Sequence, residues 1–233
     1  MGARAAILSK IRRSLGVDGT ETDRRAVAAD RLQRAPRGLV PKRGAGSASE
    51  QKALFMKMAE AVQASVVTVP SRQAVPEAVA DYLRGRNLPP SLKTGADPRI
   101  TALPFEANTP TLEVRHGPSD GQDPVGLSYA FAGIAETGTL VLHSGPDNPT
   151  TLNFLPDTHV VVVDAQDIDG DYETAWTRLR DTFGKGVMPR TVNMITGPSR
   201  SGDIEQTLLL GAHGPRDLHI IVVEGAGTSG ESA

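Results

Sequence analysis

Residues 159–163 read HVVVV and residues 218–223 read LHIIVV, and these two runs decide the fold. Val160 to Val163 and Ile220 to Val223 are apolar on both faces of an extended chain, which is the pattern of strands that helices cover on both sides. The two runs therefore predict an α/β fold with a three-layer α/β/α arrangement and a mostly parallel sheet.

The segments around these runs alternate between helix and strand, as such a sheet requires. Further strands are predicted from apolar, β-branched runs at residues 66–69, 127–134, 139–143 and 192–196. Helices are predicted from apolar residues at helical spacing, at residues 50–62, 74–86, 172–183 and 204–210. The adjacent strands 127–134 and 139–143 indicate an antiparallel hairpin insertion around Glu136. Residues 89–122 are rich in Pro, Asp and Gly, and give only short candidate strands at 100–103 and 112–114.

The remaining segments divide into an arm, a linker and a tail. Residues 1–34 are predicted to be an N-terminal helical arm, with an amphipathic helix at 5–15 and a second helix at 23–33; a weakly ordered arm fits equally well. Residues 35–49 have the Pro, Gly, Ser and Arg content of a flexible linker. The α/β domain is expected at residues 50–224, and a disordered tail at 225–233.

Composition excludes several classes of function. The 233 residues include 25 Lys and Arg against 27 Asp and Glu, so the near-neutral charge disfavours nucleic acid as the main ligand. The chain has no cysteine, which removes disulfides, thiolate nucleophiles and Cys-ligated zinc or iron–sulfur clusters. No stretch approaches the ~20 apolar residues of a membrane-spanning helix, so a soluble cytoplasmic protein is expected.

Residues 191–210 contain a candidate anion site. Gly197, Ser199 and Arg200 follow an apolar strand and precede a predicted helix that opens near Asp203. Free backbone N–H groups at a helix start, with hydroxyls and a guanidinium, bind carboxylate or phosphate. The carboxyl ends of parallel strands are the usual place for such a loop. Equally, Ser201 or Asp203 caps the helix and Arg200 lies in solvent.

The segment His213-Gly214-Pro215-Arg216 lies in the loop before the last strand. His213 is a candidate general acid or base, because an unperturbed imidazole titrates near neutral pH. A simple turn after a helix that ends at Gly211 is favoured for this segment taken alone. His143 and His159 flank a loop that holds Asp147, but their spacing matches no compact zinc pattern, so no metal site is predicted.

Glu136 stands beside a Thr137-Gly138 bend that opens the strand from Thr139. Glycine at such a bend allows a close backbone approach to a ligand. Glu136 is therefore a nucleophile or base if its carboxylate faces a cleft. Alternatively it is a solvent-facing residue of a hairpin turn, which its chemistry alone favours.

Three motifs occur in order along the chain: GIAETGTLVLHSGP (133–146), LNFLPDTHVVVV (152–163) and GPSRSGDIEQTLLLGAHGPRDLHIIVVE (197–224). Together they resemble the LUD domain of the lactate-utilisation protein C family, over about residues 50–224. The N-terminal ILSKIRRSLG is similar to that family's usual opening. The family more often has Ser-Arg-Thr-Ala-Asp where this chain has Ser-Arg-Ser-Gly-Asp at 199–203, which keeps Arg200 and Asp203.

The resemblance implies a fold like that of sugar-phosphate isomerases and CoA transferases (the NagB/RpiA/CoA transferase-like fold). It also implies a part in oxidising L-lactate to pyruvate, as a non-redox component beside two partner proteins that carry the iron–sulfur clusters. No cofactor is expected in this chain; its expected partners are those iron–sulfur lactate-utilisation subunits and a small carboxylate or other anionic metabolite.

The site residues that follow from motifs and resemblance are Glu136 and His213 as catalytic candidates. The ligand-binding candidates are Thr137, Gly138, Thr139, Gly197, Ser199, Arg200, Asp203 and Gly214. An alternative is a stand-alone transferase or isomerase, because CoA transferases of similar fold use a glutamate beside a glycine turn as the acyl-accepting nucleophile. This rests on analogy of fold and leaves open whether the chain is catalytic by itself.

Overall fold

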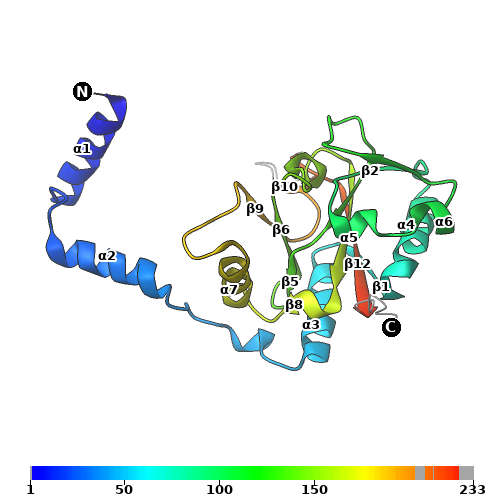
Figure 1. The fold of residues 1–233 in the computed structure, drawn as a ribbon, viewed down its shortest axis with the longest axis horizontal. Helices are drawn as coiled ribbons and strands as arrows, with labels where there is room; N and C mark the ends of the chain where they lie inside the picture. Colours follow the sequence, from blue (N-terminus) through cyan, green and yellow to red (C-terminus); the bar gives the residue numbers. More distant parts are fainter. Residues whose placement is uncertain (1, 203–207, 212, 226–233) are drawn as a thin grey trace, which may run out of the picture. The chain divides into compact units, whose positions relative to one another are not determined.

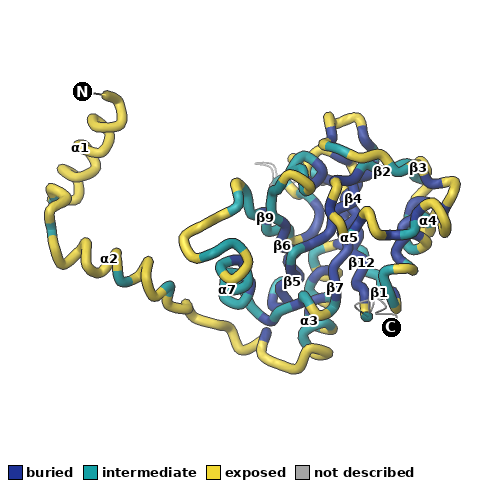
Figure 2. Tube along the Cα trace, viewed as in Figure 1, coloured by how far each residue is buried: buried dark blue, intermediate teal, exposed yellow. Residues whose placement is uncertain are grey.

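The computed structural model describes residues 2–202, 208–211 and 213–225, and the chain forms two compact units, Met1–Leu39 and Val40–Ala233. The first unit holds α1 (Ala3–Leu15) and α2 (Thr22–Arg34), within two residues of the predicted helices. Neither helix buries a residue, as the exposed colouring in Figure 2 shows. The unit boundary falls inside the predicted linker 35–49, whose end holds the short turn η1 (Lys42–Gly44).

The core of the second unit is a six-stranded sheet in which every neighbouring pair of strands is parallel. Its order is β1 (Ser65–Ser71), β12 (Asp217–Gly225), β7 (Thr158–Asp164), β4 (Val125–Tyr129), β2 (Ser91–Thr94) and β3 (Glu113–His116). All seven residues of β7 are buried. The predicted α/β class with a mostly parallel sheet is confirmed.

Side chains of the central strands alternate between two apolar clusters, one on each face of this sheet. Val160 and Val162 pack with α4 (Val75–Gly85), together with α5 (Pro98–Thr101) and α6 (Phe105–Asn108). Val161 and Val163 pack with α3 (Ala48–Ala61) and with a second sheet. Figure 1 shows α4 and α6 on one side of β12 and the second sheet on the other. Burial on both faces is what the unbroken valine run predicted.

The second sheet contains the predicted hairpin but is larger than expected. Its order is β8 (Ile168–Asp169), β5 (Ala132–Ile134), β6 (Thr139–His143) and β9 (Val192–Ile195). β6 pairs antiparallel with β5 and with β9, and α7 (Tyr172–Phe183) covers the outer face through Ala175 and Leu179. The short turns η2 (Arg72–Ala74), η3 (Thr150–Asn153) and η4 (Ala165–Asp167) connect the elements.

Three predicted elements are wrong. The strand 127–134 is two strands, because the Ala130 N–H bonds to Val162 in the parallel sheet while the Phe131 N–H bonds to Val141 in the second sheet. Residues 98–101 are the helix α5, capped by the Asp97 side chain, where a strand at 100–103 was predicted. Residues 208–210 form β11 (Leu208–Leu210), paired antiparallel with β10 (Arg200–Gly202), in place of the end of a helix.

Short apolar runs such as Leu208–Leu210 fit either a helix or a strand, so periodicity alone cannot decide between them. The rest of the predicted helix, residues 204–207, lies outside the described residues, as do Asp203 and the tail 226–233. In the described part of the chain, no helix is both long enough and apolar enough to cross a membrane.

Candidate functional site

A pocket of about 450 Å³ opens beside the amino ends of β7 and β12. Its walls come from the segment after β9, the loop before β12 and the residues that follow η3. The described residues that line it are Val62, Asn153, Phe154, His159, Met194, Ile195, Thr196, Gly197, Pro198, Ser199, Arg200, His213, Gly214, Pro215 and Leu218. Gly197, Ser199, Arg200, His213 and Gly214, the predicted site residues of the third motif that the structure describes, all line it.

Backbone contacts hold the two loops of the third motif together at this pocket. The Ser199 N–H donates to the Pro215 carbonyl at 2.8 Å, and the Gly211 N–H donates to the Ser199 carbonyl at 3.0 Å. Gly197 has φ 74°, and a Cβ there would lie 2.5 Å from the carbonyl oxygen of Val62. The Arg200 guanidinium donates to that same carbonyl. Glycine is therefore needed at position 197 for the loop after β9 to reach the end of α3.

The described residues that line the pocket carry a net positive charge. Arg200 is the one Arg or Lys among the described lining residues, and no Asp or Glu is among them. Arg200 and His213 are exposed, and Ser199 is half-buried beside them. A guanidinium with a neighbouring hydroxyl and imidazole suits a carboxylate or phosphate ligand.

The location of this pocket corrects one expectation. β9 belongs to the second sheet and runs antiparallel to β6, so the loop after it does not lie at a carboxyl end of the parallel sheet. Residues 213–216 come before β12 and lie at its amino end. The pocket therefore forms at the opposite end of the parallel sheet from the one that the rule for α/β sheets indicates.

Sequence reasoning missed the buried polar chain in the pocket wall. His159, only 1% exposed, places Nε2 at 3.0 Å from Ser128 Oγ, and Ser128 Oγ donates to Asn153 Oδ1 at 3.1 Å. Burial lowers the pKa of His159 to about 3, so the imidazole is neutral. His159 Nδ1 is buried and makes no hydrogen bond to any described residue. A histidine inside an otherwise apolar strand was the available signal.

The two histidines considered for a metal site have separate surroundings. The His143 ring packs edge-on against Phe131 and Phe183, with ring centroids 5.4 Å and 5.0 Å away. His159 instead belongs to the Ser128 chain. Among the described residues, no group of three or more His, Asp or Glu side chains is placed to hold a metal ion.

Glu136 is not a lining residue of this pocket. It is 4% exposed at the turn between β5 and β6, so the solvent-facing alternative is wrong. Its Oε1 accepts a long hydrogen bond of 3.4 Å from the Tyr172 N–H. Among the described residues its Oε2 has no hydrogen-bond partner, and the Arg43 guanidinium lies beside it, with Nε 3.9 Å away. Because the carboxylate is buried, a nucleophilic role would require the residues around it, the Arg43 side chain among them, to move aside.

The neighbours of Glu136 connect the hairpin with the pocket. Thr139 Oγ1 lies 2.6 Å from Thr196 Oγ1, and Thr196 lines the pocket. The same Thr139 hydroxyl lies 3.0 Å from the Tyr172 hydroxyl and 2.7 Å from that of Thr137. Gly138 has φ 67° and packs against the backbone of α3. These residues support the pocket wall from behind, and none of Glu136, Thr137, Gly138 and Thr139 is among the described residues that line the pocket.

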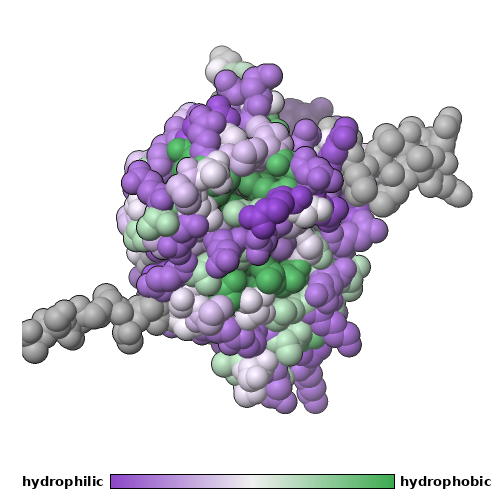
Figure 3. Space-filling model, turned by 90° about the vertical axis from the view of Figure 1, so that its right-hand side faces the viewer, coloured by the Kyte–Doolittle hydropathy of each residue, from purple (hydrophilic) through white to green (hydrophobic). Residues whose placement is uncertain are grey.

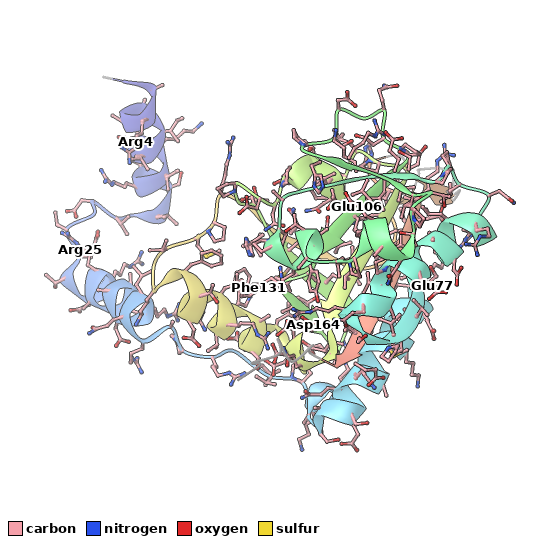
Figure 4. The ribbon with its side chains drawn as sticks, turned by 45° about the vertical axis from the view of Figure 1, so that its right-hand side comes forward. Arg4, Arg25, Glu77, Glu106, Phe131 and Asp164 are labelled. Carbon is pink, nitrogen blue, oxygen red and sulfur yellow. The ribbon has the colours of Figure 1, made fainter. Side chains whose placement is uncertain are left out.

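A second polar cluster, to which no sequence motif pointed, lies at the carboxyl ends of the parallel strands. Asp164, labelled in Figure 4, ends β7 and is 2% exposed. It accepts from Arg72 at 2.6 Å and from the Tyr129 hydroxyl at 2.7 Å. Burial and the hydrogen bond to Asp164 raise the pKa of Tyr129. The Arg99 guanidinium lies 4.2 Å from the Tyr129 ring centroid. These groups satisfy one another, which indicates a structural role.

A groove of about 770 Å³ runs between α5, α6 and the edge strand β3. Its described lining includes Leu103, Phe105 and Leu112, and it contains none of the predicted site residues. Figure 3 shows the side of the domain that carries α4 and α6, where hydrophobic surface is visible between hydrophilic groups. The pocket beside β7 remains the better candidate site, because it joins a cation with buried polar atoms.

Comparison with known proteins adds a family match. Residues 122–223 match the model of the LUD domain. An uncharacterized protein of Neisseria meningitidis serogroup B is 36% identical over 128 residues, which are 55% of this chain and 53% of that protein. The lactate utilization protein C of Geobacillus thermodenitrificans is 38% identical, and that of Bacillus subtilis 37% identical, each over 103 residues, 44% of this chain and 43% of theirs. The chain spans about half the length of the curated relatives it matches.

A crystal structure supports the architecture. A DUF162 family protein from Deinococcus radiodurans superposes with a TM-score of 0.57 at 22% identity, covering 77% of this chain and 99% of that chain. This likeness concerns the fold. The matched segment 122–223 contains Glu136, the His159 chain, Arg200 and His213.

Proposed function

We propose that this chain, whose residues 122–223 match the LUD domain and which is similar to lactate utilization protein C sequences, serves lactate utilisation as a non-redox component that binds a small anion. The name of these relatives, lactate utilization protein C, supports a role in lactate utilisation. The absence of cysteine supports a non-redox role beside partner proteins that hold the iron–sulfur clusters, since thiolate-ligated clusters need cysteines from other chains. Iron–sulfur lactate-utilisation subunits are the proposed partners.

The observation that carries the proposal is the pocket beside β7 and β12. Arg200 supplies a cation at its rim, and Ser199 and His213 supply further hydrogen-bonding groups. No described lining residue carries a carboxylate that would repel an anion. A small carboxylate fits this set of groups because a guanidinium can bond both of its oxygens.

The test of the binding site is calorimetric titration of the purified full chain with L-lactate and with pyruvate. Replacing Arg200 by Gln is expected to weaken binding of the better ligand by roughly tenfold or more, because hydrogen bonds to charged groups contribute ~1.5–3 kcal/mol. Arg84→Gln is the matched control, since the Arg84 side chain is exposed on α4 and pairs with Asp81. Equal affinity of wild type and Arg200→Gln would overturn the anion site.

The proposed role in lactate utilisation is tested by growth on L-lactate. A host that lacks its own copy of the relative is expected to grow on L-lactate when it carries this chain and its partner genes. Growth without this chain, in a host with no second copy, would contradict a role in lactate utilisation. Co-purification of this chain with the iron–sulfur subunits from lactate-grown cells tests the proposed partners.

The second candidate function is a transferase or isomerase that uses Glu136. What favours it is the buried Oε2, which has no hydrogen-bond partner among the described residues, because such a carboxylate oxygen is poorly solvated and available to react. What disfavours it is the position of Glu136 outside the pocket, under η1. A Glu136→Gln chain that is folded and still supports growth on L-lactate would exclude this candidate.

A further inference from the structure

The pocket beside β7 and β12 is larger than a small anion requires. Its volume of about 450 Å³ lies in the range of ~300–1,000 Å³ that is usual for ligands of drug size. A three-carbon carboxylate held by Arg200 would leave most of that space to water. The remaining walls of the pocket therefore determine what else its ligand carries.

Much of the remaining wall is apolar and accessible. Seven of the fifteen described lining residues have apolar side chains. Among them Phe154 is 41% exposed, and Val62, Met194 and Ile195 are half-buried, so these residues keep surface that a ligand can cover. Water beside apolar surface is bound weakly, and its displacement by an apolar group increases affinity.

The polar and apolar parts of the lining are direct neighbours. A Cβ built on Gly214 would lie 3.3 Å from Ser199 Cβ and 3.9 Å from Phe154 Cδ1, so this glycine lies beside both the hydroxyl side chain and the aromatic ring. The Arg200 guanidinium donates to the carbonyl of Val62, another apolar lining residue, and that bond uses only one of its N–H donors. A single ligand can therefore contact the charged and the apolar groups at the same time.

The charge of the described lining suits an anion with a single charge. Arg200 is the one Lys or Arg among these residues. A carboxylate matches one guanidinium, whereas a dianionic phosphate would bring negative charge that Arg200 does not neutralise.

We propose that the pocket binds an amphipathic monocarboxylate, whose carboxylate pairs with Arg200 and whose apolar chain covers Phe154 and the apolar residues near it. This inference rests on the proposed anion site and deepens it, because it adds an apolar body of several carbons to the ligand. The anionic group alone then accounts for only part of the affinity.

The experiment is calorimetric titration of the purified full chain with three straight-chain acids, butyrate, hexanoate and octanoate. Each methylene group that becomes buried contributes about fourfold in affinity, so we expect octanoate to bind roughly a hundredfold more tightly than butyrate. The neutral 1-octanol has a chain of the same length without the charge. It is expected to bind at least ~tenfold more weakly than octanoate, because it lacks the charged hydrogen bonds to Arg200.

The outcomes separate this inference from the anion site. Equal affinities for the three acids would overturn the inference and leave the anion site standing. Equal affinities for octanoate and 1-octanol would overturn the anion site and the inference with it. Absence of binding by every probe would also overturn both.

Two adjacent exposed residues provide a matched pair of variants. Phe154→Ala removes the aromatic ring from the lining, and is expected to weaken octanoate binding by roughly tenfold while butyrate affinity stays within about twofold. Leu155→Ala removes an apolar side chain of similar exposure, 47% against 41%, which is not among the described lining residues, and is expected to change neither affinity. Equal octanoate affinities of the two variants would overturn the inference. The comparison of probes on the wild-type chain requires neither variant to fold.

Discussion

Gly138 is the residue at which the first motif touches the rest of the domain. Its φ is 67°, and a Cβ built there would lie 2.3 Å from the backbone nitrogen of Ala59 in α3. Gly138→Ala must therefore accept a left-handed backbone and displace the helix. We expect a loss of about 2–4 kcal/mol in the free energy of unfolding, measured in urea. Gly145→Ala, with nothing within 4 Å of the new Cβ, is the control.

An equal and small effect of both alanine substitutions would contradict this account of the bend.

The glycine bend itself could be predicted from residues 136–139, because Thr-Gly before an apolar run is a local signal. The burial of Glu136 could not. It depends on α3, on η1 and on the Tyr172 N–H, which come from distant parts of the sequence, and the solvent-facing turn that local chemistry favours is wrong for that reason.

At the scale of elements, three strand ends are joined through one carboxylate. Asp164 at the end of β7 bonds Tyr129 at the end of β4 and Arg72 directly after β1. Asp164→Asn leaves the Arg72 charge without its buried partner, so we expect about 3 kcal/mol of destabilisation in thermal or urea unfolding. Asp81→Asn breaks the exposed Arg84 pair and is expected to cost less than about 0.5 kcal/mol. Similar losses for both would contradict a structural role of the Asp164 cluster.

The strands and helices that were predicted correctly have strong patterns of their own. β7 and β12 each contain an uninterrupted apolar run of four residues, Val160–Val163 and Ile220–Val223, and α4 and α7 have apolar residues on one face. The wrongly predicted strands and helices occur where contacts with a distant segment determine the local structure. Residues 127–134 look continuous, but the chain passes from one sheet to the other between Ala130 and Phe131. β11 is a strand because it pairs with β10, which no local pattern reveals.

At the scale of the whole molecule, the second sheet explains why part of the site was predicted and part was not. Gly197, Ser199, Arg200, His213 and Gly214 are close in sequence or separated by one hairpin, and they do meet at one pocket. The end of the sheet at which they meet depends on β9 joining β6 in the second sheet. The motif predicted which residues gather, and only the topology could place them beside His159.

Two buried histidines should make the stability of the whole domain depend on pH. Burial lowers the pKa of His159 to about 3 and that of His219 to about 4, against 6.5 for an exposed imidazole. The unfolded chain therefore binds more protons below pH ~6.5, and stability is fully present above that pH and falls as the pH decreases toward ~4.

Each histidine contributes about 1.4 kcal/mol per pH unit in that window, so the free energy of unfolding is expected to fall by on the order of 4 kcal/mol between pH ~6.5 and ~5. Urea unfolding at pH 7, 6 and 5 measures it. In His219→Phe, whose ring can still stack on Tyr82, the slope should be about half as steep, because one titrating group is gone. A free energy of unfolding that stays constant from pH 7 to pH 5 in the wild-type chain would show that these histidines are not buried as neutral groups.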